Sequence, residues 1–365
     1  MMVAVMAVLQ WGGEPSWREV GPLLDRWCND CHRAGQVGPF DFTSYEGAVA
    51  YAPEIARYVL GGKMPPWRAK PSGVEWANSR GLPDEVTAKL LAWTNTGMKP
   101  GKAVMKKRHP QWNLGVPGVV LSQPREHTVA AERAVDIVRF TAGPEELGNG
   151  GKDVYFDGFE LRPSNRALLH HALLRVEGEP IAAWAMSDGG LRLPAGVAWK
   201  IGAGKKLEVE LHYFKRNLRP ARDLTRVALY WAKGKPGRVA RLLELKKEAL
   251  RIPAGANVHR EAMRFRLPSG ARVYAVLPVF QLLATQVRMK WGDERDYFLW
   301  VEPFEHHLMS SYLPARPLSG RELEVEAVYD NSAQNPYNPH QKLREVRFEE
   351  NGLDETFRVW LTVGR

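Results

Sequence analysis

The sequence predicts a multidomain protein in which an N-terminal all-α domain is followed by two all-β antiparallel sandwich domains. Hydrophobic residues recur at helical spacing up to about residue 100, and they alternate with a period of two further along the chain. A chain of 365 residues is also too long for one ordinary hydrophobic core. We expect a helical domain over residues 16–100, a linker over 101–112, and sandwich domains over 113–235 and 236–365.

Three helices are expected in the first domain. Ser16 is a candidate N-cap for the first of them, because apolar residues follow it at helical spacing. A second helix is expected over about 44–60, where Pro53 should kink or split it and Gly61 should end it. The third begins near Pro83, which suits a first helical turn. The apolar positions of the first helix are Trp17, Val20, Leu24 and Trp27.

The second half of the chain reads as strands separated by turns rich in proline and glycine. Alternating segments predict half-buried antiparallel strands. Typical sandwiches contain about 100 residues, so two consecutive modules fit the available length. The clearest alternating segments are "KLEVELHYFK" (206–215), "ARVYAVLPVF" (271–280) and "RELEVEAVYD" (321–330).

The charge and the ends of the chain exclude some partners. The net charge is +10, but the densest basic cluster is the short "MKKRH" at 105–109. A solvated basic surface is therefore favoured over nucleic-acid binding. No apolar run reaches the length of a membrane span. Residues 1–15 begin with about ten apolar residues and are interpreted as a possible remnant of an export signal.

The two cysteines of the chain lie together in "CNDCH", as Cys28 and Cys31, with His32 directly after them. This is the attachment pattern of c-type haem. Two intervening residues let both thiols reach the vinyl groups of one porphyrin, and the histidine then faces the iron. A redox CxxC would follow a strand and need no histidine, and a structural zinc site would need further Cys/His pairs. Haem c is therefore the expected cofactor.

A second axial ligand is expected for the haem iron, and methionine commonly takes that position. "GGKMPPW" places Met64 between the second and third helices, where two prolines stiffen the loop. Met98 in "NTGMKPG" is the second candidate. The alternative role for either is that of an ordinary core methionine.

Three histidines in the β half form a candidate copper site. His170 and His171 are adjacent in "ALLHHALLR", and His212 lies in "LEVELHYFK". Neighbouring residues of a regular strand point to opposite faces, so a chelating pair requires a bulge or a strand end. Three imidazoles suit copper. The alternative is that the pair arose by chance and that His212 is an ordinary hydrogen-bonded strand histidine.

These motifs carry a resemblance to a known family. "CNDCHRAGQVGPFDFTSYEGA", "MPPW" and "LPDEVTAKLLAWTNTGM" resemble the cytochrome c module of bacterial proteins similar to copper type II ascorbate-dependent monooxygenases. The rest of the chain is similar to the two-sandwich core of peptidylglycine α-hydroxylating monooxygenase and its relatives, including "YDNSAQNPYNP". The resemblance implies a cytochrome c-like first domain and jelly-roll-like sandwiches. It also implies that His170, His171 and His212 hold the copper through which electrons enter.

The oxygen-activating copper of that family is expected to be missing. Its ligands are replaced by "PVFQLLA" and "LDET", where Val279, Gln281 and Thr356 offer no good ligand for Cu(I). A replacement site would need other residues. Such residues occur in "EPFEHHLMSS", which holds His306, His307 and Met309, although a surface or turn role is favoured for them.

The expected function is that of an extracytoplasmic c-type haem redox protein, passing electrons to or from the three-histidine copper. The partner would be a redox protein or a small reductant, with hydroxylase activity doubtful and no catalytic residue or substrate assigned. One alternative is a non-catalytic haem-bearing binding protein with a vestigial sandwich; a weaker one is a zinc-dependent hydrolase. Because haem c is generally attached outside the bacterial cytoplasmic membrane, a periplasmic or exported location is expected.

Overall fold

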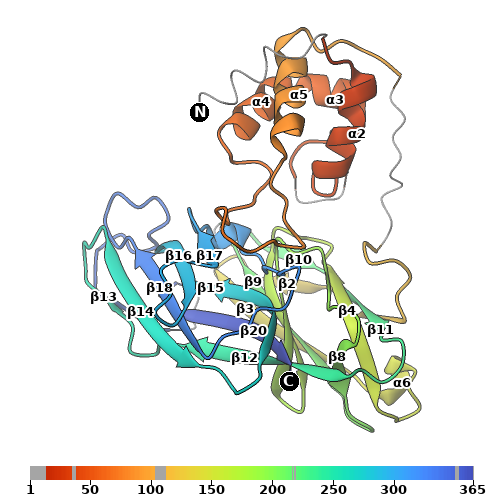
Figure 1. The fold of residues 1–365 in the computed structure, drawn as a ribbon, viewed down its shortest axis with the longest axis vertical. Helices are drawn as coiled ribbons and strands as arrows, with labels where there is room; N and C mark the ends of the chain where they lie inside the picture. The colour runs from red at the N-terminus through yellow and green to blue at the C-terminus, as the bar shows by residue number, and fades with distance from the viewer. Residues whose placement is uncertain are drawn as a thin grey trace. The chain divides into compact units, whose positions relative to one another are not determined.

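The structure, a computed structural model, describes residues 14–34, 38–102, 112–215, 217, 219–349 and 353–364. Most of the possible export signal and most of the expected linker lie outside these residues. The chain folds into two compact units (Figure 1). One comprises Met1–Trp67 with Ser79–Gln111, and the other comprises Arg68–Asn78 with Trp112–Arg365.

The helical unit contains short helices around a small apolar core (Figure 1). Ser16 precedes the first helix, and its backbone N–H donates to the Glu19 carboxylate at 3.0 Å, which satisfies one donor at the helix start. The expected second helix is split, and Pro53 lies in the first turn of its second part. The helices are α2 (Trp17–Trp27), α3 (Tyr45–Ala50), α4 (Ala52–Leu60) and α5 (Asp84–Asn95).

The β unit is built on a large sheet that contains strands from both halves of the β region. Its strand order is β1–β11–β4–β8–β12–β20–β15, and β7 pairs with β4. The bounds are β1 (Val119–Ser122), β4 (Val154–Arg162), β7 (Gly190–Arg192), β8 (Val197–Ile201), β11 (Arg226–Trp231), β12 (Arg238–Lys246), β15 (Arg272–Val279) and β20 (Arg358–Gly364).

Two four-stranded sheets and two short strand pairs complete the unit. One four-stranded sheet has the order β3 (Val135–Ala142), β9 (Leu207–Phe214), β5 (Leu169–Val176) and β6 (Glu179–Ala185). The other has the order β14 (His259–Arg266), β18 (Glu322–Tyr329), β16 (Ala284–Trp291) and β17 (Leu299–Val301). The short pairs are β10 (Ala221–Asp223) with β2 (His127–Val129), and β13 (Arg251–Ile252) with β19 (Val346–Arg347). Two short helices, α6 (Pro144–Leu147) and η1 (His306–Leu308), lie between strands.

A parallel pairing joins the two halves of the large sheet. Arg238 pairs with Val197, and Val239 pairs with Ala198, which links β12 to β8. All the other strand pairings within this sheet are antiparallel in the described residues. The residues on the two sides of position 235 therefore share one sheet and belong to one compact unit.

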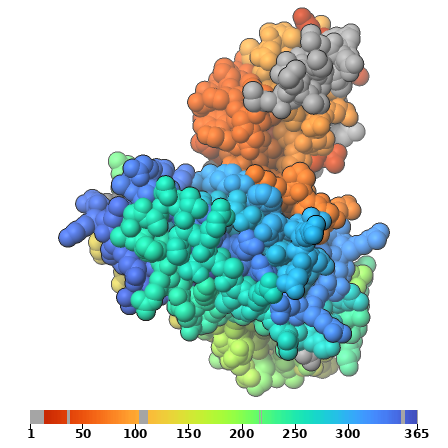
Figure 2. Space-filling model, turned by 60° about the vertical axis from the view of Figure 1, so that its left-hand side comes forward, coloured from red at the N-terminus to blue at the C-terminus, as the bar shows by residue number. Residues whose placement is uncertain are grey.

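The segment Arg68–Asn78 lies between two helices in sequence but folds with the β unit. The backbone N–H of Lys70 donates to the Trp300 carbonyl at 2.7 Å. Asn78 closes a pair of hydrogen bonds, donating to the Ser311 carbonyl and accepting from the Leu313 N–H. Figure 2 shows the orange atoms of this segment beside the light-blue atoms of the residues near 300.

These observations correct the predicted fold class. The expected all-α cytochrome c-like domain over residues 16–100 is wrong, because eleven of those residues fold with the β unit and the helices described in that range are only 6–12 residues long. The expected pair of jelly-roll-like sandwich domains is also wrong as two modules, because the large sheet runs through both. The chain is mostly β, and sandwich character is the part of the prediction that remains compatible with it. No described helix has both the length and the apolar character needed to cross a membrane.

Candidate metal site

The three histidines expected to bind copper lie on two neighbouring strands of the β unit. His170 and His171 are on β5, and His212 is on β9. The register between these strands shifts between Leu169 and His171, after which His171 pairs directly with His212. Adjacent residues of a regular strand point to opposite faces. This irregularity allows the rings of His170 and His171 to meet on one side of the sheet. The Nδ1 atoms of His170 and His171 are 2.9 Å apart.

A fourth imidazole joins this cluster from a distant part of the chain. The ring of His306, from η1, stacks on that of His170 with centroids 3.9 Å apart. On the other side, the ring of His171 stacks on that of His212 at 4.1 Å. His170, His171 and His306 are each less than 9 % exposed, so the cluster is largely shielded from water.

Hydrogen bonds fix the tautomers of two of these rings. His170 Nε2 lies 2.9 Å from the His306 carbonyl oxygen, which can only accept. His212 Nε2 lies 2.7 Å from Glu210 Oε1, and an ionised carboxylate likewise only accepts. Each Nε2 therefore carries a hydrogen, and each Nδ1 keeps a lone pair. Partners of this kind commonly orient histidines that ligate metals.

Burial keeps His170 and His171 neutral near pH 7. Desolvation lowers the pKa of His170 to about 4. The same cause, reinforced by the neighbouring His212 and His170, lowers the pKa of His171 well below its ordinary value. Metal ions bind the neutral form of imidazole, so these shifts favour ligation at neutral pH.

The described residues supply two converging ring nitrogens rather than a finished site. Their 2.9 Å contact is a hydrogen bond that His171 Nδ1–H donates to His170 Nδ1, so a metal ion would have to replace that hydrogen. No group of three or more His, Cys, Asp or Glu side chains in the described ranges is arranged to hold a metal ion as it stands. Two nitrogens 2.9 Å apart, each about 2.05 Å from one metal, would subtend an angle of about 90°. That angle suits tetragonal Cu(II) better than tetrahedral zinc. His212 would complete the set only by sliding or turning from its stacked position.

Glu210 and the His306 carbonyl are the contributors that sequence reasoning missed. Glu210 precedes His212 by two residues, so the period of a strand already put the two side chains on one face. The i, i+2 spacing of a carboxylate and a histidine was therefore a usable signal. The position of His306, 136 residues from His170, left no such signal.

The proposed replacement copper ligands are not brought together. His307 is exposed, and its ring lies 5.8 Å from that of Tyr337. Met309 is 2 % exposed and packs in an apolar cluster with Trp360 and Leu277. Only His306 of that trio belongs to the imidazole cluster.

The residues that replace the oxygen-activating copper ligands are held by hydrogen bonds. Thr356 Oγ1 donates to the Val279 carbonyl at 2.9 Å. The buried Glu355 carboxylate accepts from the backbone N–H groups of Gln281 and Leu283 at 2.5 and 2.9 Å. A carboxylate and its backbone donors thus surround Gln281 and Thr356.

The "CNDCH" motif follows α2 in the helical unit. Cys28 and Cys31 are free thiols, and burial raises the pKa of Cys28 to about 12. The His32 ring stacks on Phe42 at 4.7 Å. Its buried Nδ1 has no hydrogen-bond partner among the described residues. Met64 lies in the loop after α4, and its backbone N–H donates to the Tyr58 carbonyl at 3.1 Å.

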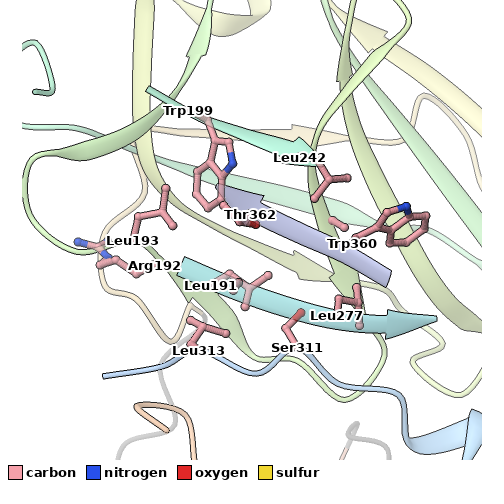
Figure 3. Close-up of a pocket in the computed structure, with 12 residues that line it drawn as sticks. Leu191, Arg192, Leu193, Trp199, Leu242, Leu277, Ser311, Leu313, Trp360 and Thr362 are labelled. Carbon is pink, nitrogen blue, oxygen red and sulfur yellow. The ribbon is translucent and has the colours of Figure 1, made fainter. Parts of the chain in front are cut away.

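A narrow cavity lies elsewhere in the β unit (Figure 3). It has a volume of about 10 Å³, roughly the room that one water molecule needs. Its walls are mostly apolar, and the buried Trp199 Nε1–H has no hydrogen-bond partner among the described residues. This cavity is too small for an organic substrate. Its labelled lining includes Leu191, Trp199, Leu242, Leu277, Trp360 and Thr362.

Comparisons with known proteins assign no family to the chain. No family model matches it, and no curated protein matches it. Similar solved structures include the major capsid protein P2 from bacteriophage PM2, at 9 % identity and a TM-score of 0.31, covering 67 % of this chain and 97 % of that one. Another is the STIV MCP, at 8 % identity and a TM-score of 0.30, covering 67 % and 96 %. These scores are too low to assign a fold or a function.

The predicted resemblance is corrected by these results. Membership of the cytochrome c and copper monooxygenase family has no support from a family model or a curated relative. The haem-to-copper electron relay that depended on this resemblance is withdrawn, together with the cytochrome and oxidoreductase roles. Among the predicted functions, a non-catalytic binding role fits the β-rich chain better than either enzyme.

Proposed function

We propose that the β unit is a non-catalytic metal-binding protein whose imidazole cluster holds one transition-metal ion. The observation that carries this proposal is the 2.9 Å separation of the Nδ1 atoms of His170 and His171. Because His170 Nε2 already donates to a carbonyl, its Nδ1 offers a lone pair at this point. The third donor in the proposal is His212, whose Nε2 is likewise occupied.

Copper is the metal that this arrangement favours. The angle of about 90° for two nitrogens on one metal suits tetragonal Cu(II), and divalent copper binds nitrogen donors more tightly than zinc does. The proposal is limited to binding, in keeping with the non-catalytic role that fits the chain better. A bound ion would also stabilise the fold, by about 2.7 kcal/mol at a free concentration 100 times its Kd.

Metal titration of the full chain tests this proposal. Cu²⁺ and Zn²⁺ are added separately to metal-free protein, and bound metal per chain and the unfolding temperature are measured. We expect one Cu²⁺ per chain, tighter binding of Cu²⁺ than of Zn²⁺, and loss of the site in His171→Ala. His259→Ala is the matched control, because His259 is a strand histidine bonded to Glu261 away from the cluster. Absence of Cu²⁺ binding in the wild type, or equal loss in both variants, would contradict the proposal.

We also propose that the helical unit carries covalent haem c. Cys28 and Cys31 would form the thioethers, and His32 and Met64 would face the iron. The motif spacing supports this assignment. A pyridine haemochrome spectrum of protein made in a host that matures c-type haem tests it: a covalent haem absent from Cys31→Ala is expected, and no haem would overturn it.

A compartment and a partner follow from the haem proposal. Because attachment of this haem generally takes place outside the bacterial cytoplasmic membrane, we propose a periplasmic or exported location. Fractionation of cells that express the chain tests the location. A partner protein or a small reductant that meets the haem stays a prediction of the sequence.

A further inference from the structure

We infer that Glu210 is a positioning residue for the imidazole of His212 and that it sets the metal affinity of the cluster. This inference rests on the proposed metal-binding function. It concerns a carboxylate that neither the metal-ligand motif nor the comparisons assign to a site. Its basis is three contacts of the Glu210 carboxylate, one with His212 and one with each of two arginines.

The first contact joins the carboxylate to the imidazole. Glu210 and His212 lie two residues apart on β9, so their side chains share a face of the strand. Glu210 Oε1 accepts a hydrogen bond from His212 Nε2 at 2.7 Å. The Glu210 side chain is 2 % exposed, so little water competes for this bond. The ring of His212 is therefore held by a buried acceptor on the side away from its Nδ1.

The other contacts hold the carboxylate itself. Glu210 Oε2 lies 2.6 Å from Arg139 Nε on β3 and 3.0 Å from Arg175 Nε on β5. Three donors surround this buried carboxylate: Arg139 donates to Oε2, while Arg175 and His212 donate to Oε1. Two guanidinium groups from the flanking strands thus keep the carboxylate ionised and prevent it from turning.

The consequence concerns the donor atom of His212. An ionised carboxylate opposite Nε2 keeps the hydrogen on that nitrogen and leaves the Nδ1 lone pair for a metal. It also makes the imidazole a stronger donor. Removing a partner of this kind typically lowers metal affinity about 10- to 100-fold. A glutamate with a purely structural role would leave the tautomer of His212 unchanged.

The test compares Glu210→Gln with Glu208→Gln in the full chain. Glu208 is the matched control, because it lies on the same face of β9, also approaches Arg139, at 3.9 Å, and is two residues further from His212. Cu²⁺ affinity is measured by competition with a chelator. The tautomer of His212 is read from the ¹⁵N chemical shifts of its ring in metal-free protein.

We expect Glu210→Gln to lose about 10- to 100-fold in Cu²⁺ affinity and its His212 to leave the pure Nε2–H tautomer, whereas Glu208→Gln matches the wild type. Wild-type affinity and tautomer in Glu210→Gln would overturn the inference. If Glu210→Gln does not fold, Arg175→Gln takes its place; it should lower the affinity in the same direction, and an unchanged affinity would overturn the inference. If the wild type binds no Cu²⁺, the proposed function fails, and the tautomer measurement alone still decides the positioning role.

Discussion

Asp188 joins two segments of the β unit, and replacing it with asparagine is expected to destabilise that unit strongly. The side chain is buried, with 3 % of the residue exposed, and follows β6. Its Oδ1 accepts from the Ser311 N–H at 2.8 Å and from the Ser310 hydroxyl at 3.2 Å. Its Oδ2 accepts from the Ala185 N–H at 2.9 Å and from the Ser311 hydroxyl at 2.7 Å. One carboxylate therefore satisfies four donors.

The size of the effect follows from these four contacts. Asparagine keeps the shape of the side chain but replaces one oxygen with an NH₂ group, which donates and cannot accept. Whichever oxygen is replaced, one buried backbone N–H loses its acceptor and faces a donor, the serine hydroxyl on that side must turn to accept, and the remaining bonds lose their charge. Hydrogen bonds to charged groups contribute roughly 1.5–3 kcal/mol each, and they are not additive within one network. We expect Asp188→Asn to lower the free energy of unfolding by about 3–5 kcal/mol.

Urea unfolding at pH 7 checks this value, with tryptophan fluorescence and far-UV circular dichroism followed together. Because the chain has two units, each transition is fitted separately, and only the transition of the β unit should move. Asp153→Asn serves as the control, since Asp153 is a surface carboxylate paired with Lys200 at 2.7 Å. That control should leave the midpoint close to that of the wild type, because exposed ion pairs contribute little to stability. A midpoint for Asp188→Asn equal to that of the control would refute the reasoning.

Two further substitutions test other contacts of the β unit. Burial raises the pKa of Glu355 from its ordinary 4.5 to about 7, although backbone N–H groups oppose the shift. Its contribution is therefore greatest below pH 4.5 and is lost as pH rises through 7, by about 3 kcal/mol at 1.36 kcal/mol per pKa unit. In urea unfolding, the free energy of unfolding of Glu355→Gln relative to that of the wild type should rise by up to that amount between pH 5 and pH 8. If this relative free energy does not change with pH, the raised pKa is contradicted. In Gly320→Ala, the added Cβ would lie 2.2 Å from the Trp291 ring, so we expect a loss of about 1–3 kcal/mol by thermal unfolding. Gly73→Ala, which adds a Cβ in open space, is its control, and equal losses would contradict the clash.

Local features of this chain were predictable from the sequence. The helix start at Ser16, the split at Pro53 and the alternating strands depend on neighbouring residues, so pattern and propensity were enough. Adjacent strand residues diverge unless a bulge intervenes, so the sequence stated the condition under which His170 and His171 could meet. The register shift before His171 supplies that bulge.

The remaining features depend on contacts between distant residues. The two-residue pairing of β8 with β12 turns two expected modules into one unit, and no local pattern marks it. His306 reaches the cluster across 136 residues. The family resemblance failed for a related reason. Short motifs such as "CNDCH" and "HH" indicate local chemistry but do not determine the fold of the domain that contains them.

The segment Arg68–Asn78 also dictates an order of events during synthesis. Its partners in the β unit lie more than 200 residues later, as in the contacts of Arg68 with Glu305 and of Asn78 with Ser311, 237 and 233 residues apart. At roughly 5–20 residues per second, a ribosome needs about ten to fifty seconds to supply them. Throughout that interval the connection between α4 and α5 lacks the residues that it contacts in the β unit. This segment can therefore reach its final conformation only after the last third of the chain has been synthesised.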